Sequence, residues 1–155
     1  MLTIPSVHPY LMTLLLEDPS EREQLTALTH DSWTTIIEEA IAQRLAALLF
    51  RRLNHSNYQH LVPSHLLQLL TQQMVQQTAW NLLLANELEH ILTACQTRGI
   101  TCIPIRGPVF AAQLYGDCSM RQMDDLDILV HREDLSAIRN MFDQFGYLRH
   151  EQQPG

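Results

Sequence analysis

The chain has 155 residues, which fits a single domain, and its 46% of hydrophobic residues is a globular composition. A formal net charge of -7 argues against a protein that coats nucleic acid, because such proteins are normally basic. The three cysteines have no C-x-x-C spacing and the N-terminus has no signal-peptide pattern, so we expect a cytoplasmic protein without disulfides or a membrane span.

The first part of the chain, residues 1–98, is expected to be a helical region. It contains no glycine, the residue that most often makes tight turns. Residues 9–29 are expected to form one or two short helices. In residues 31–53, apolar side chains recur at i, i+3, i+4 and i+7, which predicts one amphipathic helix. Asp31 or Ser32 can cap the start of this helix.

A longer helix is predicted from about residue 65 to residue 98. Apolar side chains follow one broad face over this whole stretch, and Gly99 suits the left-handed position that ends a helix. The polar segment before it, residues 54–60, is expected to be a linker.

The remaining residues, 99–155, change to short alternating elements and are expected to form a separate, partial core. Pro108 suits the first position of a helix, and Gly146 suits the end of another. The predicted elements are a strand at 100–105, a helix at 108–115, a strand at 125–131, a helix at 133–145 and the start of a third strand at 147–151. The fold class is therefore α+β, with the helical region packed on a small mixed sheet of β-α-β-α order that we expect to be incomplete at its C-terminus.

Two acidic residues, Asp125 and Asp127, lead directly into the apolar end of the second predicted strand. Side chains alternate along a strand, so the two carboxylates share one face, with their alpha carbons about 7 Å apart. The opposite face is uniformly apolar and is expected to point to the core: Leu126, Ile128 and Val130. Like charges this close repel unless a cation neutralises them, and a divalent metal with oxygen ligands is the natural counter-ion.

A solvent-exposed sheet edge is the simpler explanation for such a pair of acids, but the preceding turn favours a functional one. In Ile105-Arg106-Gly107, a glycine follows a strand and precedes a helix. Backbone N–H groups and the positive end of the helix dipole could bind phosphate at such a turn. A carboxylate pair beside an anion-binding turn is the minimum that nucleotide transfer requires.

These motifs, in this order and spacing, resemble the uncharacterised bacterial nucleotidyltransferase family of the DNA polymerase β-like superfamily. The resemblance covers roughly residues 9–150 and includes a tryptophan-containing helix before a long connecting helix. The motifs that carry it are Ile105-Arg106-Gly107, Tyr115, Arg121, Asp125-Leu126-Asp127 and Gly146-Tyr147.

The resemblance implies that residues 99–155 are a partial nucleotidyltransferase-like core. It also implies an enzyme that moves a nucleoside monophosphate from a nucleoside triphosphate, such as ATP, to an acceptor hydroxyl. Asp125 and Asp127 would be the catalytic residues and would hold Mg²⁺ or Mn²⁺. Arg106 and Gly107 would bind the triphosphate. Arg121 would contact phosphate or orient the acids, although an ion pair with the neighbouring acids explains it equally well.

Three features depart from the superfamily pattern. Pro108 stands where a serine usually follows the glycine, which removes a hydroxyl and an N–H donor. Arg106 replaces a lysine. The third carboxylate of the superfamily lies on a later strand, for which this chain offers only Glu151 by position. These features favour an alternative in which an inactive or truncated form of the fold binds nucleotide or a partner protein without turnover.

The acceptor is not identified by any motif in the sequence. The acidic net charge favours a small molecule or a protein over a long nucleic acid. We expect no membrane association. Wide apolar helix faces and an unpaired sheet edge favour self-association or a partner protein.

Overall fold

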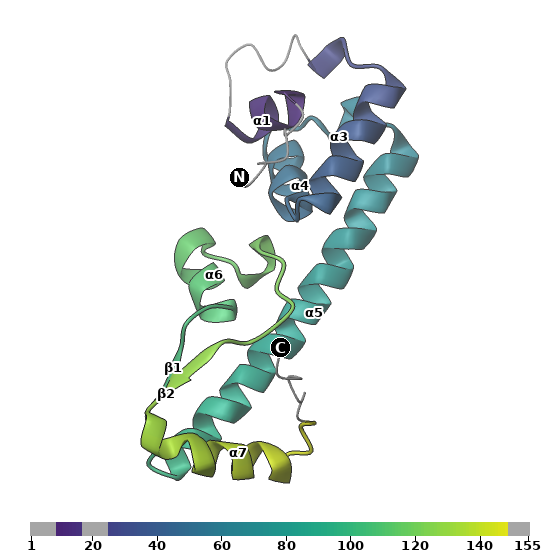
Figure 1. Ribbon diagram of the computed structural model, residues 1–155. Coiled ribbons are helices and arrows are strands. Elements are labelled where there is room, and N and C mark those ends of the chain that lie inside the picture. Colours follow the sequence, from purple (N-terminus) through teal and green to yellow (C-terminus); the bar gives the residue numbers. More distant parts are fainter. Residues whose placement is uncertain (1–8, 17–24, 149–155) are drawn as a thin grey trace, which may run out of the picture.

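The long helix α5 (Ser64–Thr97) forms the axis of the molecule (Figure 1). Short helices cover its N-terminal half, and the elements formed by the second part of the chain follow along the rest of it. The computed structural model describes residues 9–16 and 25–148. Two parts of the chain that are distant in sequence therefore meet along one helix.

The helical region packs short helices against the N-terminal half of α5. They are α1 (Pro9–Leu16), α3 (His30–Ala42), α4 (Ala46–His55) and the 3-10 turn η1 (Gln59–Leu61). Their shared core is mostly aliphatic and includes Trp33, which is 2% exposed. Helix α1 confirms a short helix within residues 9–29. The predicted linker at 54–60 is shorter than expected, because α4 and η1 each take up part of it.

The prediction of one continuous helix over residues 31–53 is wrong, because the chain turns between α3 and α4. Arg44 adopts a left-handed conformation with φ of 62°. The N–H of Leu45 donates to the carbonyl of Ala40 at 2.7 Å, and that of Arg44 donates to the carbonyl of Ile41 at 3.1 Å. This pattern of bonds ends a helix and reverses its direction. The apolar spacing continues across the turn because both helices bury side chains in the same core.

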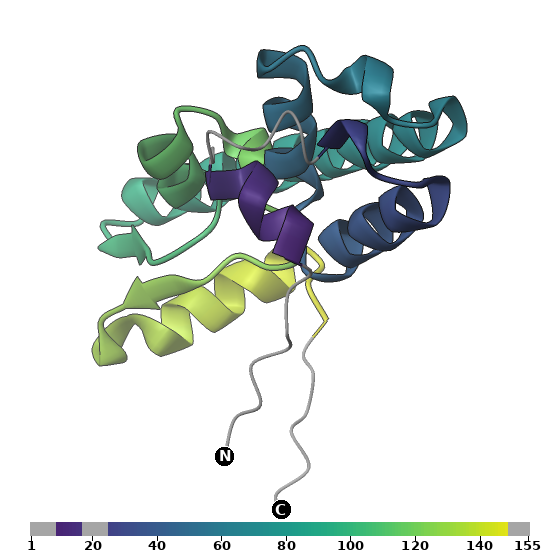
Figure 2. The same cartoon turned by 90° about the horizontal axis from the view of Figure 1, so that it is seen from above.

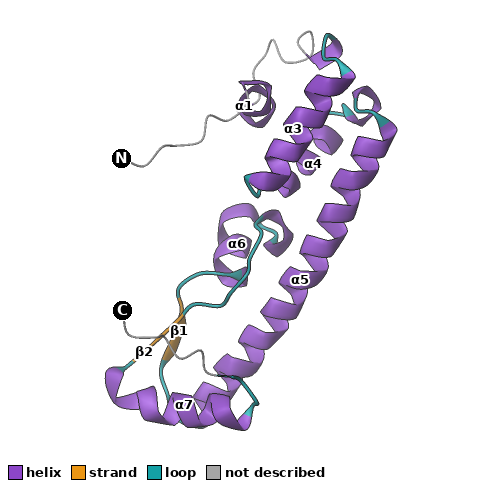
Figure 3. Ribbon diagram, turned by 45° about the vertical axis from the view of Figure 1, so that its right-hand side comes forward, coloured by secondary structure: helices purple, strands orange, loops and turns teal. Residues whose placement is uncertain are grey.

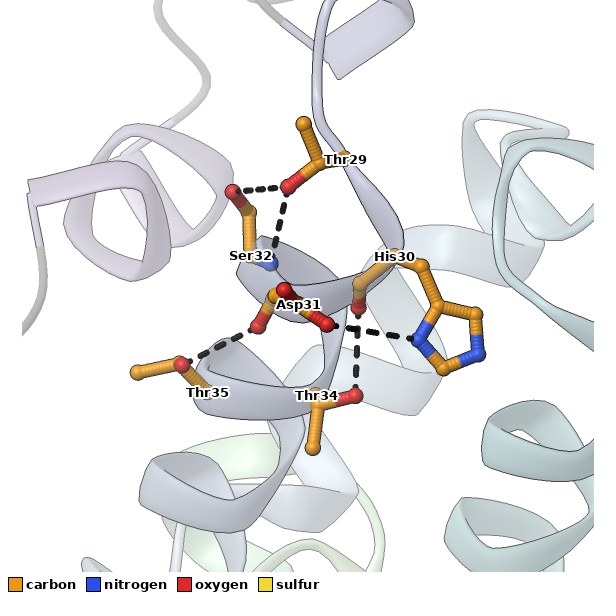
Figure 4. Close-up of polar contacts among 6 residues, drawn as sticks. All are labelled: Thr29, His30, Asp31, Ser32, Thr34 and Thr35. Atoms are coloured by element: carbon orange, nitrogen blue, oxygen red, sulfur yellow. Dashed lines mark hydrogen bonds and ion pairs between the residues drawn. The ribbon is translucent and has the colours of Figure 1, made fainter.

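The start of α3 is capped by Thr29 and not by Asp31 or Ser32 (Figure 4). The Thr29 hydroxyl accepts a hydrogen bond from the backbone N–H of Ser32 at 3.3 Å. Asp31 lies inside the first turn, where its carboxylate suits the positive end of the helix dipole. The Thr35 hydroxyl donates to the Asp31 carbonyl at 3.0 Å. The helix thus begins at His30, two residues earlier than a cap at Asp31 would allow and three earlier than a cap at Ser32 would allow.

The long predicted helix is confirmed, as is the left-handed turn at Gly99 (φ of 69°). At this turn the N–H of Ile100 donates to the carbonyl of Cys95 at 2.9 Å. Helix α5 contributes to each of the buried clusters that make up the core. Its buried apolar residues include Leu66, Leu70, Met74, Ile91 and Cys95. Within residues 9–16 and 25–148, no helix is long and apolar enough to span a lipid bilayer.

The second part of the chain confirms the predicted strand-helix-strand-helix order and the α+β class. Its elements are β1 (Cys102–Pro104), α6 (Pro108–Tyr115), the 3-10 turn η2 (Cys118–Met120), β2 (Ile128–Val130), the 3-10 turn η3 (Arg132–Asp134) and α7 (Leu135–Gln144). Figure 3 shows the strands as a short ribbon between α6 and α7.

The sheet is antiparallel over the part of the chain that the structure describes, with Cys102 opposite Val130. A parallel partner, which a mixed sheet needs, is absent from that part. Tyr147 and Leu148 are not in a strand, and the rest of the predicted third strand lies outside the described residues.

The ribbon and α7 lie side by side and share a second buried cluster (Figures 1 and 2). Helix α7 contributes Ile138 and Met141, which are 5% and 1% exposed. The apolar face predicted for the second strand packs against this cluster: Leu126, Ile128 and Val130. That part of the strand prediction is confirmed. Because these apolar side chains pack into the core, the neighbouring acids are directed away from it.

Candidate active site

A cavity of about 230 Å³ lies where the turn between α3 and α4 meets the segments before α6 and β2. We call it the site cavity. Its wall includes three arginines, two aspartates and one glycine: Arg44, Arg106, Arg121, Asp124, Asp125 and Gly107. Four of the five residues predicted from the sequence as site residues therefore line one cavity.

The remaining predicted residue, Asp127, lies immediately before β2. Its carbonyl accepts a hydrogen bond from the N–H of Ile105 at 2.9 Å, so strand pairing extends to this residue. Its carboxylate lies 3.9 Å from the guanidinium Nε of Arg106, in an ion pair between partly exposed side chains. Asp127 is thus connected to the site cavity through Arg106.

Asp125 departs from the predicted geometry, because β2 begins only at Ile128 and Asp125 precedes the paired segment. The side chains still alternate between the core and the solvent, as the sequence predicts. Leu126 packs towards the second cluster, Asp125 is exposed, and Asp127 is partly exposed. Both carboxylates therefore avoid the core.

Gly107 adopts a conformation that explains why glycine occupies this position. Its φ of 91° and ψ of -146° lie in a region that is essentially restricted to glycine. Gly107 is the N-cap of α6, its carbonyl accepts the N–H of Ala111 at 3.1 Å, and Pro108 takes the first helical position as predicted. The first turn of a helix leaves N–H groups without partners inside the helix, and this turn begins at the site cavity.

We expect Gly107→Ala to lower the free energy of unfolding by about 1–3 kcal/mol, the range for such backbone strain. The added Cβ would meet Leu126 at 3.5 Å and Met123 at 3.9 Å, which are ordinary contacts, so strain and not a clash causes the loss. Urea denaturation measures the change. Gly116→Asn is the matched control, because φ of 70° and ψ of 1° form a left-handed conformation that asparagine accepts. Equal losses in the two variants would contradict this account.

Arg121 is held in place by the long helix, through contacts that the sequence analysis missed. The side-chain amide of Asn81, on α5, donates to the carbonyls of Cys118 and Arg121, both at 2.8 Å. Gln77, one turn earlier, donates to the carbonyl of Ser119 at 2.7 Å. Asn81 is fully buried, and a single asparagine on the apolar face of a predicted helix is the signal that could have identified it.

Arg44 is the second residue that the sequence analysis missed. It forms an ion pair with Asp124, one of the acids that follow Arg121 closely in the sequence. No local pattern marks Arg44, because its partners come from a distant part of the chain.

A larger cavity of about 820 Å³ lies along the C-terminal half of α5 and reaches Phe145, but it contains none of the predicted site residues. At its edge, the Tyr147 hydroxyl donates a hydrogen bond to the Glu87 carboxylate. Burial and then this bond raise the pKa of Tyr147 to about 12. We place the candidate site in the smaller cavity because it gathers the charged groups and the glycine turn.

The donor set of the site suits a hard divalent cation in part. Asp125 and Asp127 offer carboxylate oxygens, the ligands that Mg²⁺ prefers, and Mg²⁺ commonly takes its remaining ligands from substrate phosphates and water. Among the described residues, no group of three or more His, Cys, Asp or Glu side chains could hold a metal ion. Glu151, the candidate third acid, lies outside them.

A family model described as an uncharacterised nucleotidyltransferase matches residues 29–154, which is most of the chain and includes the whole site cavity. The chain belongs to this nucleotidyltransferase family. Neither a curated protein nor a solved structure gave a significant match. The family membership assigns the general class of reaction, nucleotidyl transfer, to the fold described above.

Proposed function

We propose that this member of the nucleotidyltransferase family is a metal-dependent enzyme that transfers a nucleoside monophosphate from a nucleoside triphosphate to an acceptor hydroxyl. One observation carries the proposal. The site cavity brings two predicted phosphate-binding arginines, the glycine turn and one predicted metal-binding aspartate together, from the turn before α6 and the loop before β2.

In this proposal, Arg106 and Arg121 bind the triphosphate, since guanidinium groups form strong charge-assisted bonds with phosphate oxygens. Gly107 lets the phosphates approach the backbone at the start of α6. The acceptor oxygen bonds to the α-phosphorus and its hydroxyl proton passes to water. The bond from this phosphorus to the bridging oxygen breaks, and pyrophosphate leaves. Asp125 and Asp127 would hold the divalent cation. When bound, the cation would neutralise charge on the reacting oxygens.

The direct test supplies ATP labelled at its α-phosphate, with Mg²⁺ and separated protein and small-molecule fractions of a cell extract. The proposal expects a labelled acceptor and a matching release of pyrophosphate, both of which stop when the metal is chelated. The other nucleoside triphosphates serve as parallel substrates. Triphosphate binding without transfer to any fraction would contradict the proposed enzyme.

That last outcome would instead support a second candidate function, a nucleotide-binding module without turnover. Two observations favour it. Pro108 lacks the N–H donor that serine would supply at the turn. The described residues also contain no cluster of three acidic or other metal-binding side chains.

We expect Arg106→Ala to weaken the binding of magnesium-ATP by about 1–3 kcal/mol, the range for losing a charge-assisted hydrogen bond. The side chain is largely exposed, so its loss should leave stability almost unchanged. Isothermal calorimetry measures the affinity. Arg139→Ala, which removes an exposed arginine from α7, is the control and should bind as the parent does. If Arg106→Ala also binds as the parent does, Arg106 is not a phosphate ligand.

A further inference from the structure

Helices α3, α4, α5 and α7 end in the same hydrogen-bonded turn. In each turn an N–H group donates to the carbonyl five residues earlier, and the preceding residue is left-handed. The left-handed residues are Arg44 (φ of 62°), Asn57 (57°), Gly99 (69°) and Gly146 (82°). Glycine and asparagine suit this position, whereas a long side chain there is unfavourable. Arg44 is therefore the exception among these turns.

The stability of the fold does not explain this exception. The Arg44 side chain forms an ion pair with Asp124, but the two side chains are 58% and 52% exposed. Ion pairs with such exposure add little to stability, because water screens them. Unfavourable backbone conformations that persist tend to occur at functional sites. The side chain, and what it contacts, is the remaining reason for an arginine at this turn.

Arg44 determines the charge of the site cavity. Without it, the two cations Arg106 and Arg121 would face three carboxylates, those of Asp124 and Asp125 in the wall and that of Asp127 beside Arg106, and the formal charge of the site would be negative. With Arg44, the arginines equal the carboxylates in number, so the net negative charge that would repel a polyphosphate is removed. The helical region thus supplies the cation that offsets the negative charge of the site.

We propose that Arg44 is a third phosphate-binding residue of this site and that it contacts the polyphosphate chain of the nucleotide. The proposal rests on the proposed function and extends it to the helical region. Asp124 holds the guanidinium at the cavity wall when no ligand is bound, and phosphate oxygens replace this carboxylate when the nucleotide binds. The residue would bind substrate and would not itself take part in bond breaking.

Arg44→Gly is the variant that tests the proposal, because glycine fits the left-handed turn and lacks the guanidinium. We expect it to melt at or above the temperature of the parent and to bind magnesium-ATP at least about tenfold more weakly, as expected for the loss of one charge-assisted bond. Inorganic tripolyphosphate without metal should show the same direction of change. Arg139→Ala is the matched control and should change neither quantity.

A second variant, Asp124→Asn, separates phosphate binding from a purely structural role of the ion pair. It breaks the pair and keeps Arg44, so we expect nucleotide affinity equal to or above that of the parent. Weakened binding in Asp124→Asn, as large as in Arg44→Gly, would overturn the proposal. Parent-like affinity in Arg44→Gly while Arg106→Ala binds weakly would also overturn it and would leave the proposed function intact. If the parent binds neither probe, the proposed function fails, and the role of Arg44 fails with it.

Discussion

Replacing Asp125 and Asp127 together by asparagine should reduce nucleotidyl transfer by roughly a thousandfold or more, which corresponds to the several kcal/mol that a bound cation contributes to the transition state. Asparagine keeps the size of each side chain and removes its charge, and both side chains are at least partly exposed, so the fold should persist. The measurement is the rate of pyrophosphate release. Glu133→Gln removes an exposed carboxylate from the segment after β2 and should retain full activity.

The same variants provide a test that does not depend on turnover. A cation that binds the folded protein raises its melting temperature. Titration with Mg²⁺ or Mn²⁺ should therefore stabilise the parent and Glu133→Gln, and should have no effect on the double variant of Asp125 and Asp127. A similar rise in all three proteins would show that the cation binds elsewhere.

The second large effect is expected from Asn81→Ala, which should lower the free energy of unfolding by about 2–4 kcal/mol. The variant loses two hydrogen bonds and leaves the carbonyls of Cys118 and Arg121 without these donors. It also removes the buried Oδ1 of Asn81, which has no hydrogen-bond partner within the described residues, and this limits the loss. Urea denaturation measures the change, and Asn86→Ala, at an exposed position of the same helix, should stay within about 0.5 kcal/mol of the parent.

Asn81→Ala should also weaken the binding of magnesium-ATP, because Asn81 fixes the backbone of Arg121 at the site cavity. Calorimetry well below the melting temperature separates this effect from unfolding. A destabilised protein with parent-like affinity would show that the position of this loop is not needed for phosphate binding.

Long, strongly periodic elements were predicted well from the sequence. Helix α5 was placed to within about one residue because its apolar face is continuous and glycine follows it. The turn at Arg44 was not predicted, because it contains neither glycine nor proline and both flanking helices bury side chains in one core. A turn whose residues do not themselves favour a turn conformation cannot be recognised from the local sequence.

The candidate site was predicted as far as its residues are close in sequence. Arg106, Gly107, Arg121 and Asp125 belong to one short stretch of motifs, and all of them line the site cavity. Arg44 lies more than sixty residues earlier, so only the packing of α3 and α4 on α5 brings it there. The spacing of residues along the sequence does not predict tertiary contacts of this kind.

The two parts of the site are aligned by the screw symmetry of a single helix. Leu70 on α5 packs with α3 and α4, the helices that flank Arg44. About three turns later on α5, Asn81 anchors the loop that carries Arg121. One residue inserted between these positions would rotate one part against the other by about 100° and shift it by about 1.5 Å. Between Leu70 and Asn81, insertions and deletions are therefore tolerated only if they keep both residues on the same faces of the helix. Surface loops have no such restriction on their length.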